Sequence, residues 1–377
     1  MRKSLIWIIV SIAIIAVAGL SWFLLLRDGG AALLSIFSPG LEGKGSLHLV
    51  LRVVTDDAVS QELLQDAERI ANELHSRGIA FAGSKKGSAD SFDVTDIDPA
   101  RTDEVRSLGD QIYQGKYSVR STVTEGKTGL SFTLLPAFVR VMRESAVKQT
   151  QEAILRRLNA LGVSRPKVQI DNIGSKDIQD QLVVEIPGVD DPDRIKSIIT
   201  DMARLDLKLV EQDTGGPYSG TEQAVQANGG KVPEGYEILP FRAERSEGNT
   251  LEYMVVRTES VITSRHLKIV RPSTGVDGAP AVSFFLTTDG GDIFSRFTER
   301  HVGERLAIVL NNVIYSAPVI EGKIGAEGII SGQFTRQQAE DLSLLLRSGT
   351  LPASLVVLEE RRIGGPQGAD STSPDKK

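Results

Sequence analysis

The chain has 377 residues, a net charge of −6 from 43 basic and 49 acidic side chains, and no cysteine. The lack of cysteine excludes a disulfide framework and a thiolate metal site, so the burial of apolar surface has to hold the fold together. The charge is modest and mixed, without a block of lysine and arginine, which argues against a nucleic-acid-binding protein. Aromatic residues make up only 5% of the chain, which disfavours a stacking platform for carbohydrate.

The N-terminus carries the strongest compositional signal. Two basic residues, at positions 2 and 3, precede an apolar run from Leu5 to Leu26. At ~1.5 Å per residue, a helix of that length crosses a hydrocarbon core of roughly 30 Å. Because basic residues stay on the cytoplasmic side, residues 1–28 predict a single-pass anchor in the bacterial inner membrane, with the N-terminus cytoplasmic and the main domain periplasmic. The alternative is a signal peptide cleaved after Ala16-Val17-Ala18, although the apolar run continues beyond that site.

After a linker over residues 29–45, strands and helices alternate. The first helix ends at Gly78, where a positive φ costs little, and we expect a βαβ unit around it. Residues 83–129 are polar and interrupted by glycine, so only short strands are expected there. The expected elements are a strand at His48–Val54, a helix at Asp56–Arg77, and strands at Ile79–Ala82, Phe92–Val94 and Tyr117–Val119.

The next elements predict a ferredoxin-like βαββαβ base, in which helices cover one face of an antiparallel sheet. Asp190 or Asp191 caps the second helix, and Pro192 fits its first turn. The expected elements are a strand at Leu130–Leu135, a helix at 137–161 closed by Gly162, strands at Lys167–Ile173 and Gln181–Ile186, a helix with Ile198 and Ile199 on its inner side, and a strand at Leu205–Val210.

Residues 213–330 predict an α+β head inserted into the base. Asn311-Asn312 suits the tip of a two-residue hairpin, where left-handed backbone angles are needed. The expected elements are strands at Leu251–Arg257, Val282–Leu286, Leu306–Leu310 and Val313–Ala317, a helix at Gly291–His301, and a closing strand at Ile329-Ile330.

Thr335 and Gln338 form a capping box for a last helix. We expect this helix and a final strand at Leu355–Leu358 to return to the base, because nothing else nearby would cover Leu342, Leu345 and Leu346. The whole chain is then an α+β protein with one transmembrane helix. Its expected parts are a base over 46–212 and 331–363, a head over 213–330, and a tail over 364–377 that is disordered in composition.

Several segments resemble the SecD family of the bacterial Sec protein-export machinery. They are Glu304–Leu310, Ser316–Ile320, Ser331–Thr335, Ala339–Gly349, Glu359–Arg361, Leu155–Val163 and Val183–Gly188. The resemblance implies a ferredoxin-like base with an inserted head, and a place beside the SecYEG channel with a SecF-like subunit. It also implies contact with unfolded preprotein on the periplasmic side, which assists its release or prevents backsliding, with coupling to the proton gradient.

The chain also departs from that family. Members usually carry GLDLKGG just after the first span, where this chain has Gly40, Leu41, Glu42, Gly43, Lys44, Gly45 and Ser46, so the contact made at this junction is in doubt. Members continue into further transmembrane helices with the charged residues of the proton pathway, whereas this sequence ends at Lys377. We therefore expect no proton conduction by this chain alone. Three interpretations stay open: a truncated, specialised paralogue, the product of a split gene, or a fragment.

The sequence predicts no enzyme, cofactor or metal site. Gly126-Lys127-Thr128 and Gly43-Lys44-Gly45-Ser46 both lack the first glycine of a phosphate loop. The four histidines lie apart without metal-ligand spacing, and the acidic residues of 190–193 fit a helix N-terminus. Ser316 has no candidate general base in its sequence context.

An apolar group of residues predicts either the core of the head or a groove for unfolded polypeptide. It comprises Phe284, Phe285, Leu286, Phe294 and Phe297. The candidate preprotein contacts are Phe284, Phe285, Leu286, Tyr315 and Pro318. We therefore expect a non-enzymatic export factor, anchored in the membrane, that contacts SecYEG, a SecF-like subunit and preprotein. The alternative from another class is a membrane-anchored periplasmic ligand-binding sensor, because fold alone does not determine function.

Overall fold

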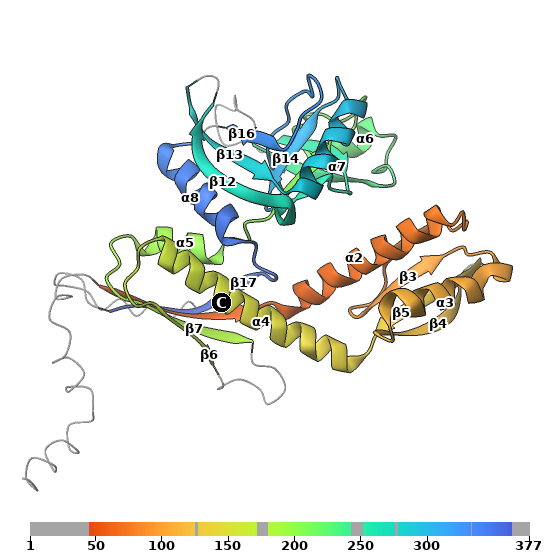
Figure 1. The fold of residues 1–377 in the computed structure, drawn as a ribbon, viewed down its shortest axis with the longest axis horizontal. Helices are drawn as coiled ribbons and strands as arrows, with labels where there is room; N and C mark the ends of the chain where they lie inside the picture. The colour runs from red at the N-terminus through yellow and green to blue at the C-terminus, as the bar shows by residue number, and fades with distance from the viewer. Residues whose placement is uncertain are drawn as a thin grey trace, which may run out of the picture. The chain divides into compact units, whose positions relative to one another are not determined.

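The structure is a computed structural model that describes residues 45–124, 127–171, 180–242, 252–275, 278–332 and 334–363. The predicted anchor at 1–28, most of the linker and the tail lie outside these residues. Within the described ranges, no helix is long and apolar enough to cross a bilayer. Ser46–Ile363 make up one unit, in which the described strands form four sheets (Figure 1).

The base is a four-stranded antiparallel sheet in the order β17-β1-β7-β6. Side chains alternate between the two faces of a strand, and Leu47, Leu49 and Leu51 are buried under helices α4 and α5. Ser46 pairs with Ile363, so the two ends of the unit lie side by side. The elements are β1 (Ser46–Val53), α4 (Pro136–Ala160), β6 (Lys167–Asp171), β7 (Gln181–Ile186), α5 (Pro192–Thr200) and β17 (Leu355–Ile363).

A lobe inserted between β1 and α4 forms a second four-stranded sheet in the order β2-β3-β5-β4. Helices α2 and α3 cover one face of it, where the rings of Phe92 and Phe132 stack with their centroids 4.8 Å apart. A Cβ on Gly109 of α3 would lie 2.4 Å from the Phe132 ring, so the close approach of helix and sheet requires glycine there. The elements are α2 (Thr55–Ser76), β2 (Gly83–Lys86), β3 (Ser91–Thr95), η1 (Pro99–Arg101), α3 (Thr102–Tyr113), β4 (Tyr117–Thr124) and β5 (Lys127–Leu134).

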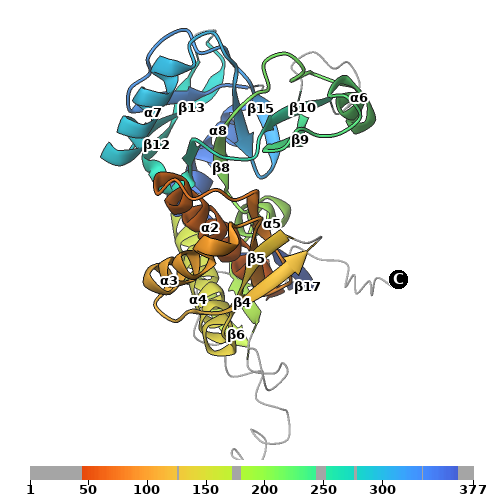
Figure 2. The same cartoon turned by 90° about the vertical axis from the view of Figure 1, so that its right-hand side faces the viewer.

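The head combines a six-stranded sheet, β10-β9-β15-β14-β8-β11, with a three-stranded sheet, β12-β13-β16 (Figure 2). One apolar cluster joins the two sheets, with Leu207, Phe284 and Phe294 among its buried members. The elements are β8 (Leu205–Leu209), α6 (Thr221–Ala227), β9 (Tyr236–Phe241), β10 (Glu252–Arg257), β11 (Ile262–Thr263), η2 (Ser264–His266), β12 (Leu267–Thr274), β13 (Pro280–Leu286), α7 (Thr288–Arg300), β14 (Leu306–Leu310), β15 (Val313–Ser316) and β16 (Glu327–Ile330).

Helix α8 (Arg336–Ser348) packs against both the head and the base. It begins with the predicted capping box of Thr335 and Gln338. Its residues Ala339 and Leu346 belong to the head cluster, while Leu345 packs with Ile198 of α5. The last strand pairs with β1 in the base sheet, whereas the helix also closes the core of the head.

The structure corrects the predicted topology. Ile79–Ala82 is not a strand, and β2 lies in the lobe sheet, so β1, α2 and β2 do not share a sheet as a βαβ unit would. The strands predicted at Leu130–Leu135 and Leu205–Val210 exist as β5 and β8, but they lie in the lobe and head sheets rather than in the base. The base uses β1 and β17 in their place. Periodicity indicates a strand but not its partner, and the two insertions place the true partners far apart in the sequence.

Candidate functional site

The three-stranded head sheet has two faces of different chemistry. Phe284 and Leu286 of β13 point into the core, with exposed fractions of 3% and 4%. Because neighbouring residues of a strand point to opposite faces, Phe285 lies on the outer face. The strand register places Ile269 of β12 opposite Phe285, and Ile329 of β16 opposite Ser283.

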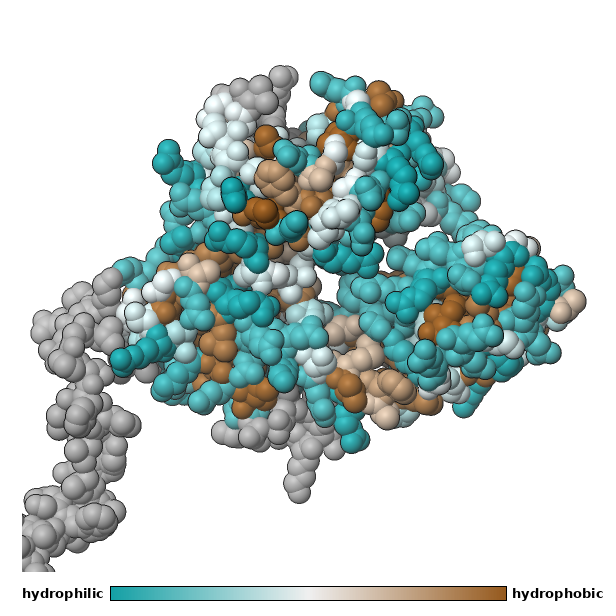
Figure 3. Space-filling model, in the orientation of Figure 1, coloured by the Kyte–Doolittle hydropathy of each residue, from teal (hydrophilic) through white to brown (hydrophobic). Residues whose placement is uncertain are grey.

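Ile269 and Ile329 are 38% and 46% exposed, and Phe285 is partly exposed between them. These three residues form what we call the outer apolar row. It runs diagonally over the three strands, because the register places Glu327 of β16 opposite Phe285, and Ile329 two residues further along. Apolar side chains show at the surface over β12 and β13 in Figure 3. Such a row on an open sheet face fits an extended polypeptide, whose side chains alternate with the same period of two.

The predicted contact residues do not lie together. Phe284 and Leu286, with Phe294, are part of the head core, which confirms the core interpretation for these three. Pro318 is exposed, and its carbonyl accepts the Leu306 N–H at 2.9 Å. Tyr315 lies at a separate cavity.

Only Phe285 among the predicted contacts belongs to the outer apolar row. The sequence prediction missed Ile269 and Ile329, although the consecutive pair Ile329-Ile330 was a signal, since one of two neighbouring strand residues has to face away from the core. Gly40, Leu41, Glu42 and Lys44 lie outside the described residues, and Gly45 directly precedes β1.

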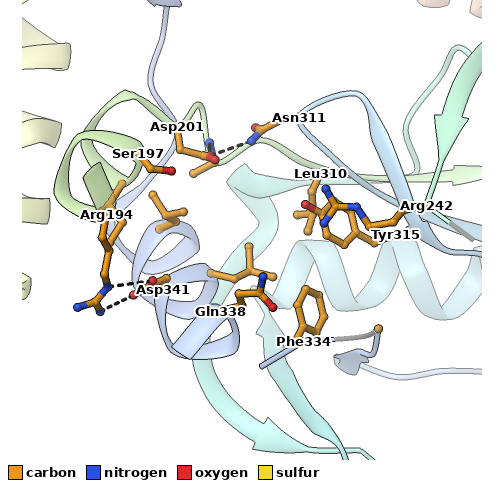
Figure 4. Close-up of a pocket in the computed structure, with 15 residues that line it drawn as sticks. Arg194, Ser197, Asp201, Arg242, Leu310, Asn311, Tyr315, Phe334, Gln338 and Asp341 are labelled. Atoms are coloured by element: carbon orange, nitrogen blue, oxygen red, sulfur yellow. Dashed lines mark hydrogen bonds and ion pairs between the residues drawn. The ribbon is translucent and has the colours of Figure 1, made fainter. Parts of the chain in front are cut away.

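A cavity of about 290 Å³ lies where α5, α8 and the β14–β15 hairpin meet (Figure 4). Two polar pairs line it. Arg194 of α5 donates to the Asp341 carboxylate of α8 at 2.7 and 3.1 Å, and this hydrogen bond raises the pKa of Arg194. The Asn311 amide donates to the Asp201 carboxylate at 2.8 Å. Both carboxylates of the cavity therefore already accept hydrogen bonds.

The opposite side of the cavity is aromatic. The rings of Tyr315 and Phe334 stack with centroids 5.8 Å apart and an interplanar angle of 16°. The Arg242 guanidinium lies 5.0 Å from the centroid of the Tyr315 ring, at cation–π distance. Leu310 and Leu342 complete the apolar wall.

A buried arginine holds the two segments at which the chain passes between base and head, residues 201–204 and 349–354. Arg157 of α4 is 0% exposed. It donates to the carbonyl oxygens of Ile198 at 2.9 Å and Gly349 at 3.1 Å, and also to the Asp201 carbonyl. These carbonyls belong to the C-terminal ends of α5 and α8, which lack partners within their own helices. Burial lowers the pKa of Arg157 to about 10, so the side chain is still charged at neutral pH.

The described residues contain no group of three or more His, Asp or Glu side chains that could hold a metal ion. The Ser316 hydroxyl is buried and makes no hydrogen bond within the part of the chain that the structure describes. The nucleophile–base pair of covalent catalysis is therefore not formed at Ser316.

These features define an α+β protein in which a lobe and a head are inserted into one antiparallel base sheet, with an exposed apolar row on the head. Two family models match the chain: the SecDF P1 head subdomain over residues 237–353, and the N-terminal part of the P1 domain of the protein translocase subunit SecDF over residues 147–212.

Curated relatives named protein translocase subunit SecD cover more of the chain. That of Koribacter versatilis is 34% identical, over 98% of this chain and 69% of the relative. That of Magnetococcus marinus is 33% identical, over 90% of this chain and 62% of the relative. That of Aquifex aeolicus is 39% identical, over 62% of this chain and 43% of the relative. A crystal structure of SecDF in its super-membrane-facing form shares 22% identity and a TM-score of 0.48, over 90% of this chain and 33% of that one. The chain belongs to the SecD family. It spans about two thirds of the length of the first two relatives.

Proposed function

We propose that this chain is an accessory factor of protein export whose head holds unfolded preprotein on the periplasmic side of the Sec channel. The observation that carries the proposal is the outer apolar row, Ile269, Phe285 and Ile329, which is exposed on a sheet whose other face is packed. Membership of the SecD family supports the export role. In this role the chain assists release of the preprotein or prevents its backsliding.

The size of the row suits a transient contact. Burying roughly 200 Å² of apolar surface at about 25 cal/mol per Å² supplies ~5 kcal/mol. Association and ordering of the bound segment consume most of that free energy. Binding through three apolar side chains is therefore weak and has little sequence preference, and a translocating chain has to be released after each contact.

The base anchors the head in this proposal. Because Ser46 and Ile363 are paired neighbours in the sheet, the segments before and after the described unit leave from one place. With Leu5–Leu26 as the inner-membrane span, the ferredoxin-like base would work on the periplasmic side, beside SecYEG and a SecF-like subunit. We place the base at β1, α4–α5 and β17, and the head between the segments 201–204 and 349–354.

A sensor of small ligands is the second candidate function, and the cavity beside α8 is the observation in its favour. A thermal-shift screen separates the two functions. A large shift with a metabolite and none with unfolded peptides favours sensing, whereas a shift with unfolded peptides favours export.

Binding of a fluorescein-labelled unfolded preprotein to the full chain in lipid nanodiscs tests the proposal. The triple variant Ile269→Ser, Phe285→Ser, Ile329→Ser should bind at least about tenfold more weakly. The matched control, Thr133→Ala on the lobe sheet, should bind like the wild type. Far-UV circular dichroism verifies that both variants are folded, and an unchanged affinity of a folded triple variant would overturn the proposal.

A further inference from the structure

The cavity beside α8 presents hydrogen-bond donors that the protein itself leaves unused. Among the described residues, nothing accepts a hydrogen bond from the Arg242 guanidinium, and the Tyr315 hydroxyl also has no partner. The Gln338 side-chain oxygen accepts the Thr335 N–H at 2.8 Å, which leaves the amide N–H groups of Gln338 available. Asp201 and Asp341 already accept hydrogen bonds from Asn311 and Arg194. Within the described ranges, by contrast, the side-chain donors of Arg242 and Gln338 are unused, and one of them is cationic.

The remaining wall of the cavity is aromatic and apolar. The rings of Tyr315 and Phe334 stack on each other, and Leu310 and Leu342 also line the cavity. Figure 4 shows Arg242, Tyr315 and Phe334 on one side and Gln338 and Asp341 on the other. The volume of about 290 Å³ is just below the range for small-molecule sites, roughly 300 to 1,000 Å³. It suits a ligand of one or two fused rings.

We propose that this cavity binds a small aromatic anion, a carboxylate or sulfonate. The rings of the ligand would pack on Tyr315 and Phe334, and its anionic group would accept hydrogen bonds from Arg242 and Gln338. A cationic ligand is disfavoured, because Asp341 is already ion-paired with Arg194 and Arg242 would repel a cation. This inference goes beyond the export role and does not rest on it.

Such a ligand would touch elements from both sides of the joint. Arg242 follows β9 and Tyr315 belongs to β15 in the head sheet, whereas Gln338 belongs to α8, which also packs on α5 of the base. Binding would therefore stabilise the arrangement of head and base seen here and raise the melting temperature.

Naphthalene-2-sulfonate is a suitable probe, measured by isothermal titration calorimetry against the full chain in lipid nanodiscs, with empty nanodiscs as the blank. We expect saturable binding at one site. Arg242→Gln should weaken it by about tenfold, through loss of the charge-assisted hydrogen bonds. Tyr315→Leu should also weaken it, and the neutral analogue 2-naphthol should bind the wild type more weakly than the sulfonate does.

Arg271→Gln is the matched control, since Arg271 lies opposite Ser283 on the outer face of the head sheet, away from the cavity. Its affinity for the probe should equal that of the wild type. Arg242 is exposed, so its replacement should leave the protein folded, and melting without ligand verifies this. The absence of saturable binding up to about 1 mM would overturn the proposal. Wild-type affinity in both Arg242→Gln and Tyr315→Leu would also overturn it, because the probe would then bind elsewhere.

Discussion

The lobe and the head each contain a sheet with helices on one face, but the opposite faces differ in chemistry. In the lobe, the register aligns Ser118 with Thr133, and Arg120 with Ser131, on the face away from α2 and α3. In the head, the corresponding face carries the outer apolar row. In a sheet with one solvent-exposed face, that face normally carries polar side chains, as it does in the lobe. The open face of the lobe sheet is therefore polar, whereas that of the head exposes apolar side chains, which our proposal assigns to polypeptide contact.

The largest expected effect tests which face of each sheet is buried. Phe284→Ala should lower the free energy of unfolding by about 3–5 kcal/mol, because it opens a cavity in the head core. Phe285→Ala, one residue along the strand, should cost much less. In the lobe, Phe132→Ala and Thr133→Ala should show the same contrast. Urea unfolding measures all four, and equal losses for Phe284 and Phe285 would contradict the assigned faces.

The two regions also differ in how they are joined to the base. The lobe is joined through α2 and α4, whereas the head is joined by two short segments that Arg157 holds. Arg157→Met should destabilise the protein by about 2–4 kcal/mol, because it leaves buried carbonyl groups without partners. Its neighbour Arg156 is the control. It is largely exposed and donates to the Ser348 carbonyl at 3.2 Å in an exposed hydrogen bond, so Arg156→Met should cost under about 0.5 kcal/mol. Similar losses for the two variants would show that the buried hydrogen bonds contribute little.

Local structure was largely predictable from the sequence. β7 and β14 have the predicted bounds, the capping box of α8 is present, and Asn311 and Asn312 have φ of +50° and +63°. These features depend on neighbouring residues, which a sequence pattern records directly. The prediction missed α3, since only Val105, Leu108, Gly109 and Tyr113 of it are buried, and a polar helix between short strands resembles a loop.

Long-range pairing and the site were not predictable in the same way. The pairing of β1 with β17 joins opposite ends of the unit, and no local pattern indicates it. The outer apolar row needs the register of three strands, of which β12 was not predicted at all. The cavity joins Arg242, Tyr315 and Phe334 from separate segments, so only Tyr315 could be singled out, and for a different role.

Transfer of the apolar row to the lobe is a gain-of-function prediction. Ser118→Ile with Thr133→Ile places two apolar side chains opposite each other on the open face of the lobe sheet. This variant should gain weak binding of unfolded polypeptide, worth about 1–2 kcal/mol, because the new side chains offer apolar area without a covering helix. Fluorescence anisotropy in the background of the head triple variant measures it. No gain of binding in a folded protein would show that an open apolar face alone is not sufficient.

The smallest expected effect is on how the melting temperature changes at mildly acidic pH. His266 accepts the Thr263 N–H at 3.1 Å, and burial, with Arg265 nearby, lowers its pKa. Its folded pKa thus lies below the unfolded value of 6.5, so its contribution to stability is present above pH 6.5 and is lost as the pH falls through the folded pKa. His266→Gln should flatten the decline of melting temperature between neutral and mildly acidic pH. If the melting temperature of this variant declines as it does in the wild type, other titratable groups cause the pH dependence.

Site-specific photo-crosslinking to a stalled export substrate tests the central claim most directly. The photoreactive residue p-benzoylphenylalanine replaces Ile329 on the head or, as the control, Thr133 on the lobe, and the membrane vesicles contain the Sec channel. The account predicts adducts with the substrate from position 329 and none from position 133. The absence of adducts at 329 while channel contacts form, or equal adducts at both positions, would contradict it.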